Sequence, residues 1–383
     1  MNQNRKNKKI GGDAGQSFGG SFVFCEKDEK GISMDLKSIT EPLLGWYDKN
    51  ARKLPWRDNP TPYRVWVSEI MLQQTRVETV KPYFERFVRE VPDVTALAAV
   101  PEDRLLKLWE GLGYYSRARN LQRAAKMVLE EYGGTLPAEP KELRKLPGVG
   151  EYTAGAISSI AYGRPEPAVD GNVLRVLARL KADGRDVRNP AVKRGEAEEL
   201  RKIYPQERCG AFTQALMELG AKVCLPNGAP LCGSCPLAGL CEGLRTGRAA
   251  SLPVLLPKPP RRIEERTVFL LLCGGKAALQ KRPETGLLAG MWEFPCAPEK
   301  LSAQKARETL AEWGIPDAEP EPLPGARHIF THVEWRLAGY LARVPSAPGR
   351  FVWAGRKDIG SRYAIPSAYK NFLRILLSRG ELC

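Results

Sequence analysis

The spacing of apolar residues changes once along this chain, and that change limits the domains it can form. From residue 35 to about residue 243, apolar side chains recur at helical intervals, with breaks at Pro- and Gly-containing segments. Residues 244–265 then carry four prolines beside several basic residues, a composition typical of a solvated linker. Beyond the linker, one helical segment and several strand-like segments follow: 302–313 as the helix, and 267–275, 291–296, 335–344 and 350–355 as strands.

These patterns predict a multidomain protein. Residues 34–243 should form an all-α domain, 244–265 an interdomain linker, and 266–383 an α+β domain. A length of 383 residues with 43% hydrophobic content is sufficient for two separate cores. Residues 1–33 are polar, glycine-rich and basic without a sustained period, which predicts a disordered N-terminal extension.

The charge balance indicates the kind of partner. The formal net charge of +15 suits a surface that binds a polyanion, although a basic surface with no such role is the alternative. No apolar run approaches the roughly 20 residues that cross a bilayer, and the first residues lack the apolar core of a secretion signal. We therefore expect a soluble, intracellular protein with no membrane partner. The chain has two histidines, His328 and His332, so a zinc-hydrolase or Ser-His-Asp site in the helical part is disfavoured.

A tight turn with two glycines is the first candidate DNA contact. The segment LPGVGEYTAGAISSIAYG (146–163) places Gly148 and Gly150 directly before an apolar helix. Glycine lets the backbone approach a phosphate closely, and the free N–H groups at a helix start donate to anions. The pattern predicts a helix-hairpin-helix that holds a DNA strand, while an ordinary helical hairpin is the alternative.

Four of the nine cysteines crowd into one loop. They form a C-x7-C-x2-C-x5-C array in a segment that also contains Pro and Gly: Cys224, Cys232, Cys235 and Cys241. Four thiolates in one loop can ligate either a [4Fe–4S] cluster or a structural zinc ion, and the spacing alone leaves both open. Free thiols are a third alternative, which this crowding disfavours.

Two carboxylates lie in settings that require an explanation. Glu69 interrupts the apolar stretch VWVSEIML, where an ionised side chain costs free energy unless it is paired or used. Burial raises a carboxyl pKa, so such a group can donate a proton near neutral pH. Asp170 stands at a predicted helix start, where capping the helix is the simpler role. Together the two suit glycosidic bond cleavage, which uses an acid for the leaving group and a carboxylate beside the cationic sugar.

Taken in order, five segments resemble the adenine DNA glycosylases of the MutY type. They are SEIMLQQTRVETV, GLGYYSRARNL, LPGVGEYTAGAI, AVDGNVLRVLARL and the four-cysteine loop, and the resemblance extends over residues 35–383. The resemblance implies an all-α helix-hairpin-helix glycosylase domain with a [4Fe–4S] cluster on the four cysteines. It also implies an enzyme that flips adenine out of double-stranded DNA, because the reactive bond is unreachable within the stack.

The resemblance also implies roles for single residues. Glu69 would protonate adenine N7, and Asp170 would stabilise the cationic sugar, either electrostatically or as a transient covalent adduct. Tyr152 and Asn172 match positions that touch these carboxylates or the sugar. The other implied DNA contacts are Trp56, Arg57, Leu72 and Val77 around the adenine, Gln74 and Tyr114 as wedges, Thr75 and Leu112 near the opposite base, and Gly148 and Gly150 in the hairpin.

The C-terminal part resembles the Nudix-like domain of the same family. Its segment RHIFTHVEWRL (327–337) matches a Phe-Ser-His loop, so Phe330, Thr331 and His332 would contact 8-oxoguanine, with threonine keeping the serine hydroxyl. A Nudix hydrolase needs a glutamate-rich helix to hold its metal. The nearest match here has Ala311 in place of a box glutamate and Glu293 in place of the first glycine, so a metal-dependent pyrophosphatase is disfavoured.

Two alternatives to this assignment stay open, and the cysteine spacing departs from the family pattern. An endonuclease III-type glycosylase/lyase needs a lysine two residues after the hairpin to form a Schiff base, and Tyr152 occupies that position, which favours a monofunctional enzyme. Seven residues separate the first two cysteines, where well-known family members have six. A non-catalytic module that binds DNA damage is the other alternative. The expected substrate is duplex DNA with adenine opposite 8-oxoguanine or guanine, bound by a monomer in a bacterial-type cytoplasm beside the nucleoid.

Overall fold

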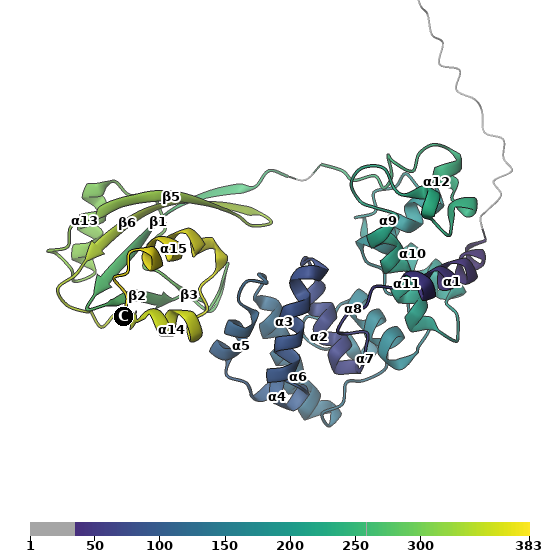
Figure 1. The fold of residues 1–383 in the computed structure, drawn as a ribbon, viewed down its shortest axis with the longest axis horizontal. Coiled ribbons are helices and arrows are strands. Elements are labelled where there is room, and N and C mark those ends of the chain that lie inside the picture. Colours follow the sequence, from purple (N-terminus) through teal and green to yellow (C-terminus); the bar gives the residue numbers. More distant parts are fainter. Residues whose placement is uncertain (1–34, 258) are drawn as a thin grey trace, which may run out of the picture. The chain divides into compact units, whose positions relative to one another are not determined.

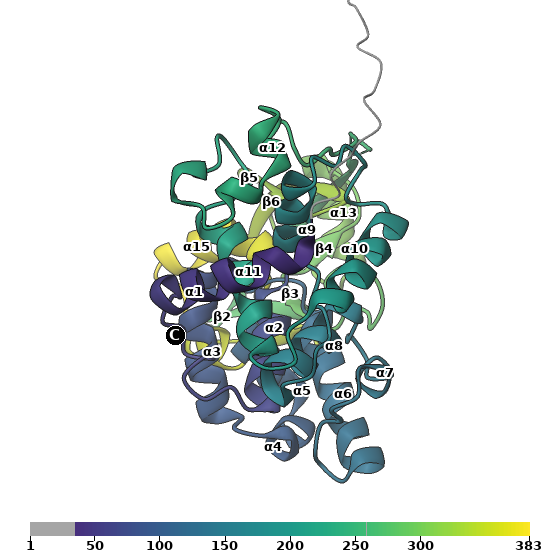
Figure 2. The ribbon, with the colours of Figure 1, turned by 90° about the vertical axis from the view of Figure 1, so that its right-hand side faces the viewer.

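The computed structural model describes residues 35–257 and 259–383, so the extension predicted over 1–33 lies outside the described residues. Up to residue 245 the described chain is helical (Figures 1 and 2). The elements are η1 Leu36–Ile39, α1 Thr40–Asn50, α2 Pro62–Leu72, α3 Val77–Glu90, α4 Val94–Ala99, α5 Glu102–Trp109, α6 Ser116–Tyr132, α7 Pro140–Leu143, α8 Glu151–Ala156, η2 Ile157–Ala161, α9 Gly171–Leu180, α10 Pro190–Ile203, α11 Cys209–Lys222, η3 Cys232–Ser234, η4 Ala238–Leu240 and α12 Glu242–Arg245.

Local chemistry sets the starts of the helices that build the site. Thr61 caps α2 by accepting a hydrogen bond from the Arg64 N–H, and Pro62 takes the first helical position, where its missing donor costs nothing. Asn189 caps α10 in the same way, also followed by a proline. Around α2, α3 and α5 the fully buried side chains form a dense aromatic core that includes Trp66, Phe84, Phe87 and Trp109.

Segments far apart in the sequence meet in this helical part. Helix α1 packs against α11, and α9 packs against both α11 and α12 (Figures 1 and 2). The predicted hairpin consists of α7, a turn in which Gly148 has φ +80°, and α8, which begins after Gly150 and continues into the π-helical turn η2. No helix in the described part of the chain has both the length and the apolar character required to cross a membrane.

The C-terminal part is built on a mixed β-sheet. Its described elements are β1 Arg262–Cys273, β2 Lys276–Lys281, β3 Trp292–Glu293, β4 Cys296–Ala297, α13 Ala303–Glu312, β5 Glu321–Ile329, β6 Val333–Arg343, β7 Val352–Ala354, α14 Arg356–Ser361, η5 Ser367–Tyr369 and α15 Lys370–Ser378. The strand order is β3-β2-β1-β6-β5, with β4 also paired to β1 and β7 to β2. Strands β1 and β6 are parallel, whereas β1–β2 and β5–β6 are antiparallel.

The second half of strand β1 is apolar on both faces because both faces of the sheet are covered there. Val268, Leu270 and Leu272 join the core formed with α14 and α15, while Phe269 and Leu271 join the core formed with α13. A central strand buried on both sides appears in sequence as a continuous apolar run. That run is the feature that predicted this strand.

The strand predictions differ from the structure in three places. The stretch 291–296 is not one strand but two short ones, β3 and β4, because Pro295 has no N–H for a ladder and the two halves pair with different partners. The sequence analysis missed β2. It also missed β5, whose prolines and glycine gave no strand pattern. Strand β5 pairs with β6 alone, and an edge strand tolerates proline.

We expect Gly155→Ala to lower the free energy of unfolding. A Cβ at Gly155 would lie 2.1 Å from the Pro167 carbonyl oxygen, so α8 and the segment leading to residue 170 must move apart. Overpacking of this kind costs about 1–3 kcal/mol, measurable by urea denaturation. Gly45→Ala on α1, where nothing lies within 4 Å of the new Cβ, is the control and should stabilise the protein by up to about 1 kcal/mol. Equal stability of the two variants would contradict the proposed close approach.

Candidate active site

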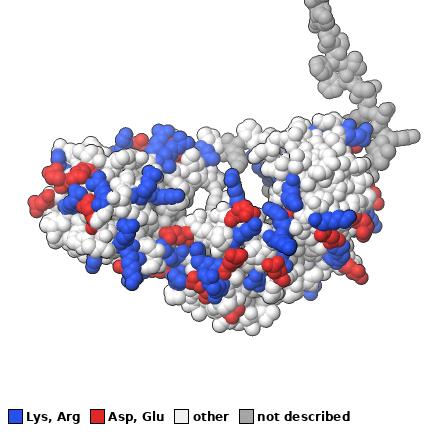
Figure 3. Space-filling model, viewed as in Figure 1, with Lys and Arg blue, Asp and Glu red and all other residues white. Residues whose placement is uncertain are grey.

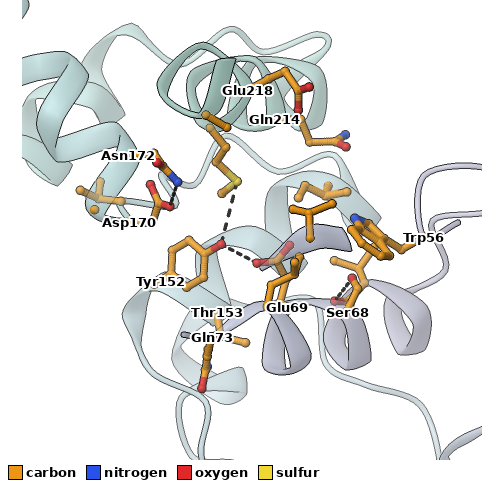
Figure 4. Close-up of a pocket in the computed structure, with 18 of the residues that line it drawn as sticks. Trp56, Ser68, Glu69, Gln73, Tyr152, Thr153, Asp170, Asn172, Gln214 and Glu218 are labelled. Atoms are coloured by element: carbon orange, nitrogen blue, oxygen red, sulfur yellow. Dashed lines mark hydrogen bonds between the residues drawn. The ribbon is translucent and has the colours of Figure 1, made fainter. Parts of the chain in front are cut away.

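A cavity of about 720 Å³ is lined by residues of α2, α8, α9 and α11 and by the turns that precede them (Figure 4). It brings together most of the residues singled out from the sequence: Trp56, Arg57, Glu69, Leu72, Gln74, Thr75, Val77, Gly150, Tyr152, Asp170 and Asn172. Gly148, Leu112 and Tyr114 do not line it. The cavity therefore gathers side chains from positions more than 100 residues apart in the sequence.

Glu69 is a buried carboxylic acid on the wall of the cavity. It projects from α2 with 5% of its surface exposed, and the Tyr152 hydroxyl donates a hydrogen bond to its Oε2 (Figure 4). Burial raises the pKa of Glu69 to about 7; the hydrogen bond from Tyr152 opposes this rise, and the nearby charge of Asp170 adds to it. A carboxyl group with this pKa is about half protonated near neutral pH and can act as a general acid.

Asp170 has two roles that the sequence presented as alternatives. Its Oδ1 accepts a hydrogen bond from the Val173 N–H at 2.8 Å and so caps α9, while its Oδ2 accepts one from Asn172 Nδ2 at 2.7 Å. The same carboxylate also lines the cavity. Burial raises the pKa of Asp170, but these hydrogen bonds act in the opposite direction and favour the charged form. Capping fixes the carboxylate in place beside the cavity.

A chain of hydrogen bonds connects Asp170 to the four-cysteine loop. Arg175 Nη2 donates to Asn172 Oδ1 at 2.9 Å and to the Gly220 carbonyl at 2.8 Å, and Arg175 Nε donates to the Cys224 carbonyl at 2.7 Å. Arg175 is 7% exposed. The start of α9, the end of α11 and the first cysteine are therefore held in one arrangement, which the sequence gave no means of predicting.

Opposite Glu69, a buried glutamate orders one wall of the cavity. Glu218 is completely buried, and its carboxylate pairs with Arg52 Nε at 2.6 Å and with Arg57 Nη2 at 2.9 Å. Burial acts to raise the pKa of Glu218, but the hydrogen bonds and charges of the two arginines outweigh it and hold that pKa below its usual value. The sequence analysis missed Arg52 and Glu218, together with Gln214 and Met217 on the same wall. A glutamate within the apolar stretch of α11 was the available signal.

Two strained turns lie beside the cavity. Gln74 and Tyr114 adopt positive φ values of 58° and 48°, and both side chains are exposed. A left-handed conformation is rare for residues with a Cβ and persists only where the surroundings enforce it. Leu112, in the second turn, is 5% exposed and packs into the helical core.

Arg117 holds the backbone of both turns in place. It is buried, with 8% exposed, and Nη1 donates to the carbonyls of Ile70, Met71 and Gln73. Nη2 donates to the carbonyls of the second turn, Leu112 at 3.2 Å and Gly113 at 3.0 Å. Burial lowers the pKa of Arg117 to about 10. One guanidinium thus fixes the backbone of both turns, and sequence reasoning did not identify it.

The residues predicted to meet 8-oxoguanine lie on the turn between β5 and β6. Phe330 turns inward, with its ring 4.9 Å from that of Trp335, while Thr331 and His332 are exposed. The Phe330 N–H donates to the Val333 carbonyl at 2.8 Å and closes the turn. Two polar side chains are therefore presented by a turn anchored on an aromatic residue.

The four cysteines surround one small cavity of about 30 Å³. Arg179 Nη1 donates to Cys224 Sγ at 3.2 Å, and Cys241 Sγ donates to the Arg179 carbonyl at 3.4 Å. Over residues 35–257 and 259–383, no three Cys, His, Asp or Glu side chains lie in a group that could hold a single metal ion. The thiols converge on a common space without forming a compact mononuclear site.

The net charge of the molecule does not by itself show where a ligand binds. On the face shown in Figure 3, lysine and arginine side chains are interspersed with acidic ones over the helical part and the C-terminal part alike. The geometry of the cavity and the hairpin carries more information than the net charge.

Comparison with known proteins identifies the family. A model of the HhH-GPD superfamily of base excision DNA repair proteins matches residues 67–205, and a NUDIX domain model matches residues 267–374. The adenine DNA glycosylase of Homo sapiens is 38% identical over 399 residues, which cover 87% of this chain and 73% of that protein. The chain belongs to the adenine DNA glycosylase family. That of Mus musculus is 35% identical over 372 residues, 82% of this chain and 72% of that protein.

A solved structure supports the helical architecture of this adenine DNA glycosylase. A thermostable thymine-DNA glycosylase matches with a TM-score of 0.51 and 28% identity, covering 55% of this chain and 96% of that one. The predicted resemblance, the fold class and the enzyme class are confirmed. The enzyme acts on DNA and removes adenine.

The raised pKa of Glu69 should make stability depend on pH in an unusual direction. The folded state holds this proton more tightly than the unfolded chain, so stability falls as the pH rises from about 4.5 to about 7 and then levels off. Glu69→Gln removes this loss of stability at higher pH, because glutamine does not ionise. We expect the variant to gain about 3 kcal/mol over wild type at about pH 8 and much less at about pH 5, measured by urea denaturation.

Glu218→Gln is the matched control. Because the pKa of Glu218 is lowered, its ionised form contributes stability above its unfolded pKa, and this contribution is lost as the pH falls through the folded value. The variant should therefore be less stable than wild type at about pH 8. A Glu69→Gln variant that is also less stable than wild type at that pH would contradict the burial of an unpaired acid.

Proposed function

We propose that this adenine DNA glycosylase excises adenine paired with 8-oxoguanine or guanine in duplex DNA, with Glu69 as general acid and Asp170 as the sugar-facing carboxylate. The observation that carries the assignment is the buried Glu69 carboxyl, with a pKa raised to about 7, in one cavity with Asp170. Two carboxyl groups with different environments are what a glycosidic cleavage requires.

In this mechanism Glu69 delivers its proton to adenine N7 and converts the base into a better leaving group. Tyr152 orients the acid through the hydrogen bond to Oε2. As the bond to C1′ breaks, positive charge develops on the sugar, and the Asp170 carboxylate stabilises it either electrostatically or by a transient bond. Asn172 holds that carboxylate at 2.7 Å, and water completes the hydrolysis.

The cavity walls suit a flipped adenine. Trp56, Leu72 and Val77 offer apolar surface, and Arg57 offers donors at the edge of the base. Among the described residues, Arg57 Nε is buried without a hydrogen-bond partner, and a ring nitrogen could supply one. Gln74 and Tyr114, on their strained exposed turns, would fill the space that the adenine leaves, and Thr75 and Leu112 belong to the turns that face the opposite base.

The opposite base is read by the C-terminal part in this proposal. Thr331 and His332 lie exposed on the β5–β6 turn, and Phe330 offers ring surface beside them. The Thr331 hydroxyl shares a hydrogen bond of 2.6 Å with the Tyr114 hydroxyl. Hydrogen bonds to the 8-oxo group distinguish 8-oxoguanine from guanine.

The four cysteines would hold a [4Fe–4S] cluster, whose contribution is to order the loop 224–241. A tetrahedral zinc with bonds of about 2.3 Å draws its sulfurs to about 3.8 Å from one another, closer than a cluster does. The thiols here surround a shared cavity instead of forming a compact group. The Arg179 guanidinium beside Cys224 Sγ favours a thiolate. The site lies within one chain, so a monomer is sufficient.

The decisive experiment is single-turnover release of adenine from a duplex with adenine opposite 8-oxoguanine, read with and without an alkaline step. Wild type should release adenine and show strand breaks only after alkali, and Glu69→Gln should lose about 10²-fold or more in rate. The rate should be flat below about pH 7 and fall about tenfold per unit above it, because the acid form is required. Thr331→Ala with His332→Ala should reduce the preference for 8-oxoguanine over guanine about tenfold.

Three other outcomes would each contradict part of this proposal. Direct nicking, or attack on a thymine glycol duplex, would indicate an endonuclease III-like glycosylase/lyase. Mismatch binding without adenine release would indicate a binding module. An unchanged rate for Glu69→Gln would exclude its acid role.

For the cluster, we expect about four iron atoms per chain by elemental analysis, with no zinc, in protein purified without oxygen. Cys232→Ser should reduce the iron content and the melting temperature together. Cys273→Ser, outside the four-cysteine loop, is the control and should change neither. One zinc per chain in place of iron would refute the assignment.

A further inference from the structure

A second cavity adjoins the first on the far side of Asp170. It has a volume of about 600 Å³ and shares Asp170, Gly171, Asn172 and Lys193 with the first cavity. One side consists of the starts of α9 and α10, and the other of Pro226 and the segment 250–255. The two cavities therefore meet at the catalytic aspartate. The residues that line only the second cavity are not part of the adenine pocket.

The polar groups of the second cavity are mostly cationic. Arg175, Arg188 and Lys193 line it, and Asp170 is the acidic residue among its lining. Two of the cations are engaged: Arg175 donates to carbonyls and to Asn172, and Arg188 pairs with Asp186 at 3.0 Å. Lys193 differs from both, because its ammonium forms no hydrogen bond or ion pair in the part of the chain that the structure describes.

Two acidic residues of α10 pair with a cation other than Lys193. Lys181 reaches α10 and pairs with Glu196 and Glu199, so acidic residues of α10 are already occupied. Lys193 lies in the first turn of the 14-residue α10, where the helix dipole also favours an anion. A lysine ammonium is a compact charge that binds phosphate without a fixed orientation.

The chemistry of the substrate supplies the matching group. The sugar whose C1′ faces Asp170 carries a phosphate on each side, and both belong to the adenine strand. A base in the first cavity therefore places at least one phosphate near the junction where Lys193 lies. Phosphate contacts fix the register of a bound strand without reading its sequence.

We propose that Lys193 binds a phosphate flanking the flipped adenosine and that the second cavity receives the adjoining nucleotide of the adenine strand. The proposal rests on the assignment of Asp170 to the sugar. Leu174, Val187 and Leu255 give this cavity apolar walls for a deoxyribose, and Lys193 is a positioning residue that holds the strand against Asp170.

The first test compares Lys193→Gln with Lys202→Gln, an exposed lysine at the other end of α10. The ligand is a duplex with 2′-fluoro-2′-deoxyadenosine opposite guanine, because the fluorine protects the glycosidic bond from cleavage. Lys193→Gln should bind about tenfold more weakly, and its log–log salt slope should fall by about 0.9. Lys202→Gln should match wild type. Equal effects of the two variants would refute a specific site.

The second test locates the phosphate. Each linkage flanking the adenosine is replaced in turn by a neutral methylphosphonate. For wild type, one of the two replacements should weaken binding about tenfold, and for Lys193→Gln the same replacement should have almost no effect, a coupling that a structural role would not produce. Independent losses at both linkages would overturn the proposal.

Adenine release separates this proposal from the proposed function. If wild type releases no adenine, the function fails, whereas the methylphosphonate coupling still reports on Lys193. If borohydride traps a covalent complex that Lys193→Gln abolishes, Lys193 is a nucleophile and the phosphate role is wrong.

Discussion

The structure depends on keeping one carboxyl group out of water without a cation to neutralise it. Glu69 is buried between α2 and α8, and the Tyr152 hydroxyl donates a hydrogen bond to it, so its proton is retained to about pH 7. Arg57 lies in the same cavity and could lower that pKa strongly if it paired with Glu69. Instead Arg57 and Arg52 pair with Glu218. Glu69 therefore has no arginine partner and keeps its proton. Two buried glutamates thus have opposite pKa shifts because only one is paired.

Buried arginines hold separate backbone segments together by hydrogen bonds in this protein. Arg117, Arg175 and Arg179 are each less than 9% exposed, and all three donate chiefly to carbonyl oxygens. A planar guanidinium with five donors can join several loops that have no regular secondary structure to connect them. Part of the positive charge of the chain therefore serves the fold of the active site, which explains why net charge is an incomplete guide to the DNA path.

The C-terminal part shows how a sheet can carry a recognition turn. The second half of β1 is buried on both faces at the centre of the sheet, while β5 is an edge strand that tolerates Pro322 and Pro324. The turn that follows β5 is anchored by Phe330 on Trp335 and leaves Thr331 and His332 exposed. Glu293, which replaces the first glycine of a Nudix box, is buried and hydrogen-bonded by Gln280. In this protein the first position of the Nudix box is therefore part of the core.

The sequence by itself determined the features that depend on local periodicity and on ordered motifs. Helices before residue 245, strand β1 and the resemblance to the family all follow from spacing along the chain, and Glu69 was identifiable because a charge in an apolar helix needs a reason. Only the tertiary structure decided which distant groups meet. Arg117 reaches two turns about 40 residues apart, Glu218 lies 161 residues from Arg57, and Lys193 shares a cavity with Asp170. Such contacts depend on the packing of helices, and no pattern along the chain encodes them, because each side chain alone looks like an ordinary surface or core residue.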